Sequence, residues 1–356
     1  MEGSGWASWL AIGLIGWSDQ IMWRNSFIQC KAKMSTVFAL CLGGLVISLP
    51  TFACALSSSS TSPLSLEGKR ALVTGSSGGI GAGIALALAA QGASVLVHYN
   101  SRYEGAKHTC AAIQKQSEER GKGACEGIIK CDFRSPKAID EMMGYIGKNC
   151  WNGQPLDILV NNAGLITKLA SDDDDEELSS WHETMAVNLH APLQLSRLAH
   201  RRMKESKQGG VIINVSSIHG SRSVEWMTAY AVSKAALDSL TRGLALEYAS
   251  DGVRVNAVAP GIVPVERTAE VLKTKEAQEM WSPHLPVGRM GSVEEIGEAT
   301  VQLCTNQWMT GTILSIDGGM MARANMPFRP RPPVPAPAVD ASGADNICES
   351  VAFEGL

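Results

Sequence analysis

Six short runs of aliphatic residues constrain the fold of this chain more than any other feature of its sequence. They occupy residues 71–74, 94–98, 156–160, 211–215, 253–257 and 312–316. Uninterrupted aliphatic runs of this length suit strands that are buried on both faces of a sheet. Helical patterns fill the intervals, and this alternation predicts right-handed βαβ units. The sequence therefore predicts an α/β fold with a doubly wound parallel sheet, in a single domain over residues 63–322.

The two ends of the chain have a different character. Residues 36–56 carry no charge, follow Lys31 and Lys33, and end in the small-x-small sequence Ala53-Cys54-Ala55. Such a pattern is typical of a cleavable targeting segment, so we expect residues 1–62 to direct the protein to an organelle or the secretory route. A membrane anchor is the alternative, because about 20 apolar residues can span a bilayer. Residues 323–356 begin with a proline-rich stretch and are predicted to form a disordered tail.

Charge and cysteine usage exclude several classes of protein. The net charge of −4 over 356 residues gives no basic footprint for nucleic acid. The nine cysteines form no CxxC pair and no His/Cys cluster at metal-ligand spacing. We therefore predict mostly reduced thiols, with neither a disulfide scaffold nor a metal site. Met34 is a second candidate for the first residue of the chain.

A glycine-rich turn follows the first aliphatic run directly. Its sequence is Thr74-Gly-Ser-Ser-Gly-Gly-Ile-Gly81, and a helical pattern begins at residue 82. Glycines at this place let backbone N–H groups approach a pyrophosphate at a helix N-terminus, where the helix dipole favours anions. A flexible loop has a similar composition, but the position between a strand and a helix favours a nucleotide site at the carboxyl ends of the strands.

Tyr230 and Lys234 form a second motif with Ser217. The lysine lies four positions after the tyrosine, which places both on one face of a helix. A tyrosine hydroxyl has a pKa of about 10 and is a poor acid or base at neutral pH. A neighbouring ammonium group favours the phenolate and lowers that pKa. The three side chains together therefore indicate proton transfer to or from a substrate oxygen.

Taken together, these motifs resemble those of the short-chain dehydrogenase/reductase family. Asn161-Asn-Ala-Gly164, Pro260-Gly261 and Asp317-Gly-Gly319 follow at the family's spacings, as do Asp132 and Asn188. The resemblance covers about 260 residues and neither terminal extension. It implies a Rossmann fold and NAD(P)-dependent interconversion of a carbonyl and a secondary alcohol. A non-catalytic relative that binds nucleotide as a scaffold is the alternative, and the presence of both Tyr230 and Lys234 argues against it.

The resemblance also implies a role for each matching residue. Tyr230 is expected to be the general acid or base, and Lys234 to lower its pKa and hold the nicotinamide ribose. Ser217 is expected to bind the carbonyl oxygen, with Ser216 as a structural serine, and Asn188 to keep a water in the proton path. The expected cofactor-binding residues are Thr74, Gly75, Ser77, Gly79, Ile80, Gly81, Ser101, Arg102, Asp132, Asn161, Ala163, Gly164, Tyr230, Lys234, Pro260, Gly261 and Val263.

The end of the second run bears on the choice of nicotinamide. Relatives that prefer NAD usually place an acidic residue there for the ribose 2′-hydroxyl. This chain has Tyr99 at that position, followed by Asn100, Ser101 and Arg102. An arginine can receive a 2′-phosphate, which favours NADP, with NAD as the alternative. Gly78 argues the other way, because many NADP-dependent relatives carry a basic residue in that part of the loop.

The sequence gives less information on the substrate and the partners. Reductases of acyl-carrier-protein substrates tend to offer basic residues before the fourth and fifth runs. Arg201, Arg202, Lys204 and Lys207 suit the first of these places, whereas Asp251 at the second would repel an acidic carrier. A small-molecule carbonyl or alcohol is therefore the favoured substrate. Family members usually pair through the helix that carries the tyrosine and lysine, so we expect a homotetramer or homodimer.

Overall fold

The computed structural model describes residues 65–166 and 178–322, which contain one parallel sheet of seven strands. The strand order is β3-β2-β1-β4-β5-β6-β7, and every neighbouring pair is parallel. The predicted doubly wound α/β fold is therefore confirmed. The strands are β1 (Arg70–Val73), β2 (Ser94–Tyr99), β3 (Ala124–Lys130), β4 (Ile158–Asn161), β5 (Gly210–Val215), β6 (Val253–Pro260) and β7 (Ile313–Ile316).

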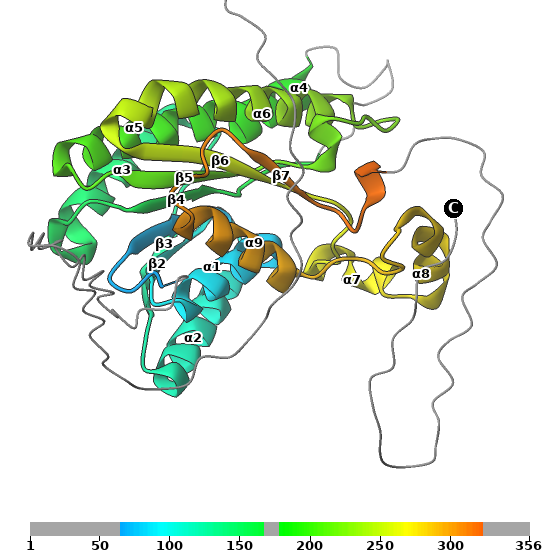
Figure 1. Cartoon of the computed structure of the whole chain (residues 1–356), viewed down its shortest axis with the longest axis horizontal. Coiled ribbons are helices and arrows are strands. Elements are labelled where there is room, and N and C mark those ends of the chain that lie inside the picture. Colours follow the sequence, from blue (N-terminus) through cyan, green and yellow to red (C-terminus); the bar gives the residue numbers. More distant parts are fainter. Residues whose placement is uncertain (1–64, 167–177, 323–356) are drawn as a thin grey trace, which may run out of the picture. The chain divides into compact units, whose positions relative to one another are not determined.

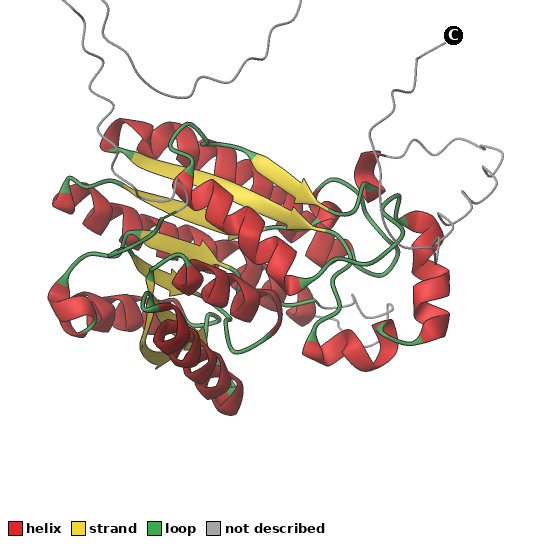
Figure 2. Cartoon of the chain, turned by 60° about the horizontal axis from the view of Figure 1, so that its bottom comes forward, coloured by secondary structure: helices red, strands yellow, loops and turns green. Residues whose placement is uncertain are grey.

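Helices cover both faces of this sheet (Figure 1). One face carries α1 (Gly79–Ala90), α2 (Tyr103–Arg120) and α9 (Val293–Thr305), and the other carries α3 (Pro136–Asn149), α5 (Ala191–Ser206) and α6 (Thr228–Tyr248). The short helices are α4 (Ser179–Met185), α7 (Glu266–Leu272) and α8 (Lys275–Trp281). Figure 2 shows α7 and α8 beyond the arrowheads of the sheet, at the edge where the carboxyl ends of the strands meet.

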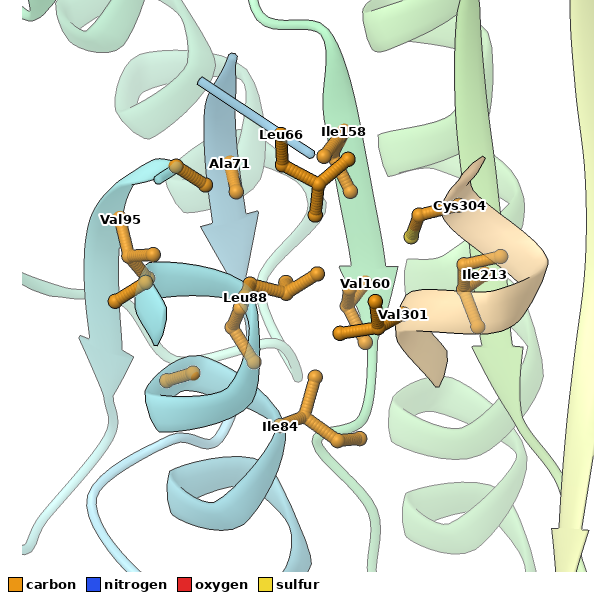
Figure 3. Close-up of a cluster of buried hydrophobic side chains, with 14 of the residues drawn as sticks. Leu66, Ala71, Ile84, Leu88, Val95, Ile158, Val160, Ile213, Val301 and Cys304 are labelled. Carbon is orange, nitrogen blue, oxygen red and sulfur yellow. The ribbon is translucent and has the colours of Figure 1, made fainter. Parts of the chain in front are cut away.

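Strand residues alternate between two separate hydrophobic clusters because successive side chains point to opposite faces. Ala71 and Val73 of β1 pack in the cluster under α1 and α9, and Leu72 between them packs in the cluster under α3 and α5. Figure 3 shows part of the first cluster, in which Leu88 of α1 and Val301 of α9 lie close to Val160 of β4. These buried contacts fix α1, and with it the glycine-rich turn, against the central strands.

Strand β3 was not among the six predicted runs. It forms one edge of the sheet, and most of its residues are exposed or half-buried. The register shifts where it pairs with β2, because Val95 lies opposite Cys125 and Leu96 lies opposite Gly127. Glu126 is the extra residue of this bulge. An edge strand with a glycine and a charged residue lacks the aliphatic run by which the other strands were found.

The prediction of mostly reduced cysteines needs one correction. Cys110 of α2 and Cys125 of β3 form a disulfide, with their Cα atoms 5.4 Å apart. Cys131, Cys150 and Cys304 are free and buried. Burial raises the pKa of Cys304 to about 12 and that of Cys131 to about 11, so both stay as thiols at neutral pH. The fifteen-residue spacing of the bonded pair carries no motif, and the packing of α2 on β3 brings them together.

The predicted targeting segment at residues 36–56 and the predicted tail at residues 323–356 both lie outside the described residues. Within 65–166 and 178–322, none of the helices combines the length and the apolar character that a membrane span requires.

Candidate active site

A cavity of about 1100 Å³ lies at the carboxyl ends of the strands. Its walls come from the glycine-rich turn, from the segments after β2, β3, β4, β5 and β6, and from α7. It is the position at which open parallel sheets bind ligands. The predicted residues that line it are Gly75, Ser77, Gly79, Ile80, Gly81, Ser101, Arg102, Asp132, Ala163, Gly164, Ser217, Tyr230, Lys234, Pro260, Gly261 and Val263.

Close backbone packing explains two glycines of the turn. Gly75 has a φ of +63°, and a Cβ there would lie 2.8 Å from Cα of Ala163. A Cβ on Gly81, the third residue of α1, would lie 2.5 Å from the carbonyl oxygen of Gly75 and would collide with the Asn162 amide. The turn therefore folds tightly against the segment after β4, which leaves its outer side free to face the cavity.

Thr74 and Asn161 do not line the cavity, and their predicted part in binding the cofactor remains a prediction. The Thr74 hydroxyl donates to the carbonyl of Val160 (3.1 Å) and accepts from the N–H groups of Asn162 (2.9 Å) and Ala163 (3.0 Å). Asn161 is buried within the sheet, where its Nδ2 donates to Asn214 (2.9 Å). Both residues hold β4 in place behind the wall of the cavity.

Asn162 is a lining residue that the prediction left out. Its Nδ2 donates to the carbonyl oxygens of Thr74 (2.8 Å) and Gly75 (3.1 Å). The side chain therefore ties the glycine-rich turn to the end of β4. The motif Asn161-Asn-Ala-Gly164 contained the signal, but the choice between its two asparagines depends on which one faces the turn.

His98 of β2 is a second residue that the sequence reasoning missed. Its imidazole is buried, and Nδ1 accepts a hydrogen bond from the Gly75 N–H (2.9 Å). Because a backbone amide can only donate, the ring must be the neutral tautomer with its proton on Nε2, which faces the carbonyl of Cys131 (3.1 Å). Burial lowers the pKa of His98 to about 4. The ring also stacks on Phe133, with the centroids 4.4 Å apart.

Tyr230 and Lys234 lie one turn apart near the start of α6, as their spacing predicted. The Lys234 ammonium is buried, donates to the carbonyl of Val215 (2.8 Å) and lies 5.6 Å from the centroid of the Tyr230 ring. Burial lowers the pKa of Lys234 to about 8, and the carboxylate of Asp238 opposes that shift. A cation held at this distance favours the phenolate form of the tyrosine.

The two serines after β5 have different surroundings. Ser217 is buried and lines the cavity together with Tyr230, and its hydroxyl accepts from the N–H of His219 (3.2 Å). Ser216 also lines the cavity, but its hydroxyl donates to the backbone carbonyl of Lys234 (3.5 Å). The geometry therefore favours Ser217 as the serine that contacts a substrate and Ser216 as a structural residue.

Asn188 lies in a π-helical turn (Ala186–His190) between α4 and α5, and it does not line the cavity. Its Nδ2 donates to the Leu165 carbonyl (2.9 Å) and to Ser233 (3.0 Å), and its Oδ1 accepts from the Leu165 N–H (2.7 Å). The Ser233 hydroxyl in turn donates to the carbonyl of Tyr230 (2.7 Å). The side chain thus anchors the turn of α6 that carries the tyrosine, while its expected part in a proton path remains a prediction.

The end of the cavity that is formed by the segments after β2 and β3, away from Tyr230, is polar. Asn100, Ser101 and Arg102 line it after β2, and Asp132 and Arg134 line it after β3. Arg134 donates to both carboxylate oxygens of Asp132, with the shortest distance 2.6 Å, and this contact lowers the pKa of Asp132. Tyr99, which stands in place of an acidic residue, packs against the ring of Tyr103.

The residues present suit a dinucleotide. The cavity extends from the polar segment after β2, past the glycine-rich turn, to Tyr230 and Lys234. Backbone N–H groups at the N-terminus of α1 are suited to phosphate, and the amino group of Lys234 to ribose hydroxyls. Tyr230 and Ser217 are left at the opposite end, where a reacting carbonyl or hydroxyl would need a proton donor and a hydrogen-bond donor.

Comparisons with known proteins agree with this arrangement. A family model described as enoyl-(acyl carrier protein) reductase matches residues 75–321. The chain is 35% identical over 257 residues to 3beta-hydroxysteroid dehydrogenase 1 of Eggerthella lenta, covering 72% of this chain and 94% of that protein. It is also 35% identical over 263 residues to a 3-oxoacyl-(acyl-carrier-protein) reductase of Pseudomonas aeruginosa, covering 72% and 99%.

A solved structure shares the fold as well. It is a gluconate 5-dehydrogenase of Burkholderia cenocepacia in complex with NADP and tartrate, with 26% identity and a TM-score of 0.64 over 74% of this chain and 100% of that one. The chain therefore belongs to the short-chain dehydrogenase/reductase family and is an NAD(P)-dependent oxidoreductase that acts on CH–OH groups.

Proposed function

We propose that this protein reduces a hydrophobic ketone with NADPH, or oxidises the corresponding secondary alcohol with NADP, and that Tyr230 transfers the proton. The observation that carries the proposal is the Lys234 ammonium, buried 5.6 Å from the centroid of the Tyr230 ring. A buried cation beside a phenol is costly to maintain unless the phenolate form is used.

The side chains divide the reaction between them. The nicotinamide supplies or accepts the hydride when it is bound. In reduction, Ser217 donates a hydrogen bond to the carbonyl oxygen as negative charge develops, and Tyr230 gives its proton to the same oxygen. Lys234 stabilises the phenolate that remains. In oxidation, Tyr230 removes the hydroxyl proton and the order of events is reversed.

The polar end of the cavity supports NADP. Arg102 and Ser101 line it, and β2 ends in Tyr99 and not in an acidic residue. A guanidinium and a hydroxyl suit a 2′-phosphate. The related gluconate 5-dehydrogenase structure contains NADP.

The lining near Tyr230 supports a hydrophobic substrate. Apolar side chains are contributed there by the segments after β4 and β5 and by α7 and α8: Leu165, Ile166, Val224, Met227, Leu272 and Trp281. Among the described lining residues, each arginine or lysine already has a partner. Arg102 contacts Glu266, Arg134 contacts Asp132, and Lys234 contacts a backbone carbonyl. A sugar acid bound beside Tyr230 would have to displace such a partner, as the 2′-phosphate of NADP must do at Arg102.

Reduction of a carrier-bound acyl chain is the alternative activity, and two contacts argue against it. Asp251 accepts from His200 (2.8 Å) and pairs with Lys204 (3.1 Å), so it neutralises one of the cations suited to an acidic carrier. The guanidinium of Arg202, a second such cation, packs against Gly147 of α3 and is therefore less available to an acidic carrier. A substrate panel followed at the nicotinamide absorbance separates these activities, with hydroxysteroid-like ketones, sugar acids and acyl thioesters compared at equal concentration.

The role of Tyr230 is tested by Tyr230→Phe. We expect turnover to fall by about 10²–10⁴-fold while cofactor binding is retained, because only the proton donor is lost. Tyr145→Phe on the exposed side of α3 is the matched control. Near-normal turnover in Tyr230→Phe would remove this residue from the mechanism. A wild-type protein that binds the cofactor but turns over no member of the panel would favour a nucleotide-binding scaffold.

The cofactor preference is tested by Arg102→Ala. We expect the dissociation constant for NADPH to rise about fivefold and that for NADH to change much less, since an exposed charge-assisted bond is worth about 1 kcal/mol. Arg120→Ala at the other end of α2 is the control. An equal rise in the dissociation constants for NADPH and NADH would show that a residue other than Arg102 determines the cofactor preference.

Assembly and targeting complete the proposal. An oligomer that pairs through α6 is supported by Val232 and Leu246, which are 40% and 83% exposed on that helix.

Removal of residues 36–56 during targeting rests on the sequence pattern alone. N-terminal sequencing of the native protein distinguishes cleavage from a retained anchor.

A further inference from the structure

A carboxylate of the protein itself occupies the phosphate-binding end of the cavity. Oε2 of Glu266 accepts a hydrogen bond from the N–H of Gly79, the first residue of α1 (3.0 Å). The same oxygen lies 3.3 Å from Nη1 of Arg102. Glu266 belongs to α7, which follows β6 and is 187 residues away from Gly79 in the sequence. One oxygen therefore bridges two groups to which the proposed function assigns the anionic parts of the cofactor.

The neighbouring residues fix the start of α7, from which this carboxylate extends with its side chain 58% exposed. Val265 packs against the hydrophobic cluster under α1 and α9, and its Cγ1 would lie 3.3 Å from a Cβ on Gly79. Thr268 closes the first turn of α7, because its hydroxyl accepts from the Val265 N–H (3.1 Å). Gly78 leaves the necessary space, since a Cβ there would collide with Oε2 of Glu266 and lie 2.9 Å from Nη1 of Arg102.

These contacts make Glu266 an internal competitor. An anion is stabilised at the N-terminus of α1 by the helix dipole and the free N–H groups, and the carboxylate already supplies one. Any phosphate that approaches Gly79 must displace it. The 2′-phosphate of NADP, which carries a charge of about −1.5 to −2, must in addition take Arg102 from it. The 2′-hydroxyl of NAD has no charge to be repelled.

We propose that Glu266 determines cofactor specificity, because it opposes the 2′-phosphate of NADP more strongly than the 2′-hydroxyl of NAD. The inference rests on the proposed function, in which Arg102 receives the 2′-phosphate. It adds an acidic residue that is supplied by α7 and not by the end of β2. The preference of the enzyme is then a balance between Arg102, which favours NADP, and Glu266, which reduces that preference.

Direct titration of NADP⁺ and NAD⁺ by calorimetry tests the proposal without reference to turnover. The variant is Glu266→Gln, which keeps the shape and removes the charge. Glu270→Gln, exposed one turn further along α7, is the matched control. We expect Glu266→Gln to lower the dissociation constant of NADP⁺ about fivefold, or about 1 kcal/mol, which is the upper range for an exposed ion pair. We expect a change of about twofold or less for NAD⁺.

The background variant Arg102→Ala separates this inference from the proposed function. In that background the selective gain for NADP⁺ should become smaller, because the competition for Arg102 is lost and only the repulsion between the carboxylate and the 2′-phosphate remains. An unchanged NADP⁺ affinity in Glu266→Gln, or an equal gain for both cofactors, would overturn the inference even if Arg102→Ala still weakens NADP⁺. If Arg102→Ala leaves NADP⁺ binding intact, the assignment of the 2′-phosphate to Arg102 fails first.

Discussion

Lowering the pH from 8 to 5 should destabilise this protein through His98. The imidazole is buried, accepts from the Gly75 N–H through Nδ1, and has a pKa lowered from 6.5 to about 4. Between these two values the unfolded chain binds a proton that the folded chain does not. Stability from this residue is therefore fully present above pH 6.5 and is lost as the pH falls towards 4.

The size of the effect follows from the shift. A difference of one pKa unit corresponds to about 1.4 kcal/mol, so the full shift is worth about 3 kcal/mol, and about 2 kcal/mol of it is lost by pH 5. Protonation of Nδ1 also breaks the bond to Gly75, so cofactor affinity should weaken at the acidic end of the same range. No change in the overall fold is needed for this second effect.

Urea denaturation followed by circular dichroism at pH 8, 7, 6 and 5 measures the free energy of unfolding. The comparison is between the wild type and His98→Gln, with His108→Gln on the exposed side of α2 as the control. Wild type and His108→Gln should each lose about 2 kcal/mol more than His98→Gln over this range. Parallel pH profiles for the wild type and His98→Gln would refute the assignment of a neutral, buried His98.

Three further predictions concern stability and assembly. Gly144→Ala should stabilise the protein by about 0.5–1 kcal/mol in thermal unfolding, because Gly144 lies inside α3 with nothing near the added Cβ. Gly81→Ala in α1 should instead destabilise the protein and weaken cofactor binding, because the added Cβ would collide with the carbonyl oxygen of Gly75. Reduction of the disulfide should cost about 3 kcal/mol in chemical denaturation, given its separation of 15 residues, and Cys110→Ser should abolish the sensitivity to reductant. Leu246→Glu should shift the mass in light scattering towards the monomer; a wild-type protein that is already monomeric would contradict pairing through α6.

Local sequence patterns, each confined to a few consecutive residues, predicted most of the fold. Five of the seven strands, β1, β2, β4, β5 and β6, were found because they are largely buried and therefore mostly aliphatic. Strand β7 is a half-exposed edge strand, and it was found because its run is nevertheless aliphatic. The spacing of Tyr230 and Lys234 placed both on one face of α6, since helical periodicity is local. Strand β3 was missed because its composition is mixed, with Glu126, Gly127 and Lys130 among its apolar residues.

Residues whose roles depend on distant partners could not be assigned in this way. Glu266 reaches Gly79 across 187 residues, and His98 in β2 reaches Gly75 across 23 residues that include α1. A histidine inside an aliphatic run was a usable signal for burial, but its hydrogen-bond partner was not visible. Thr74 and Asn161 belong to motifs of the family, yet the side-chain directions that place them behind the cavity wall depend on the pairing of β1 with β4.

The bulge at Glu126 restricts how sheets of neighbouring molecules can join. Its carboxylate turns back to accept from the Trp151 N–H (2.6 Å) and from the Ser94 hydroxyl (3.2 Å). A charged residue that interrupts the ladder of an edge strand discourages the addition of a further strand. We therefore expect this edge to resist edge-to-edge aggregation and to take no part in a sheet continued from one molecule into the next.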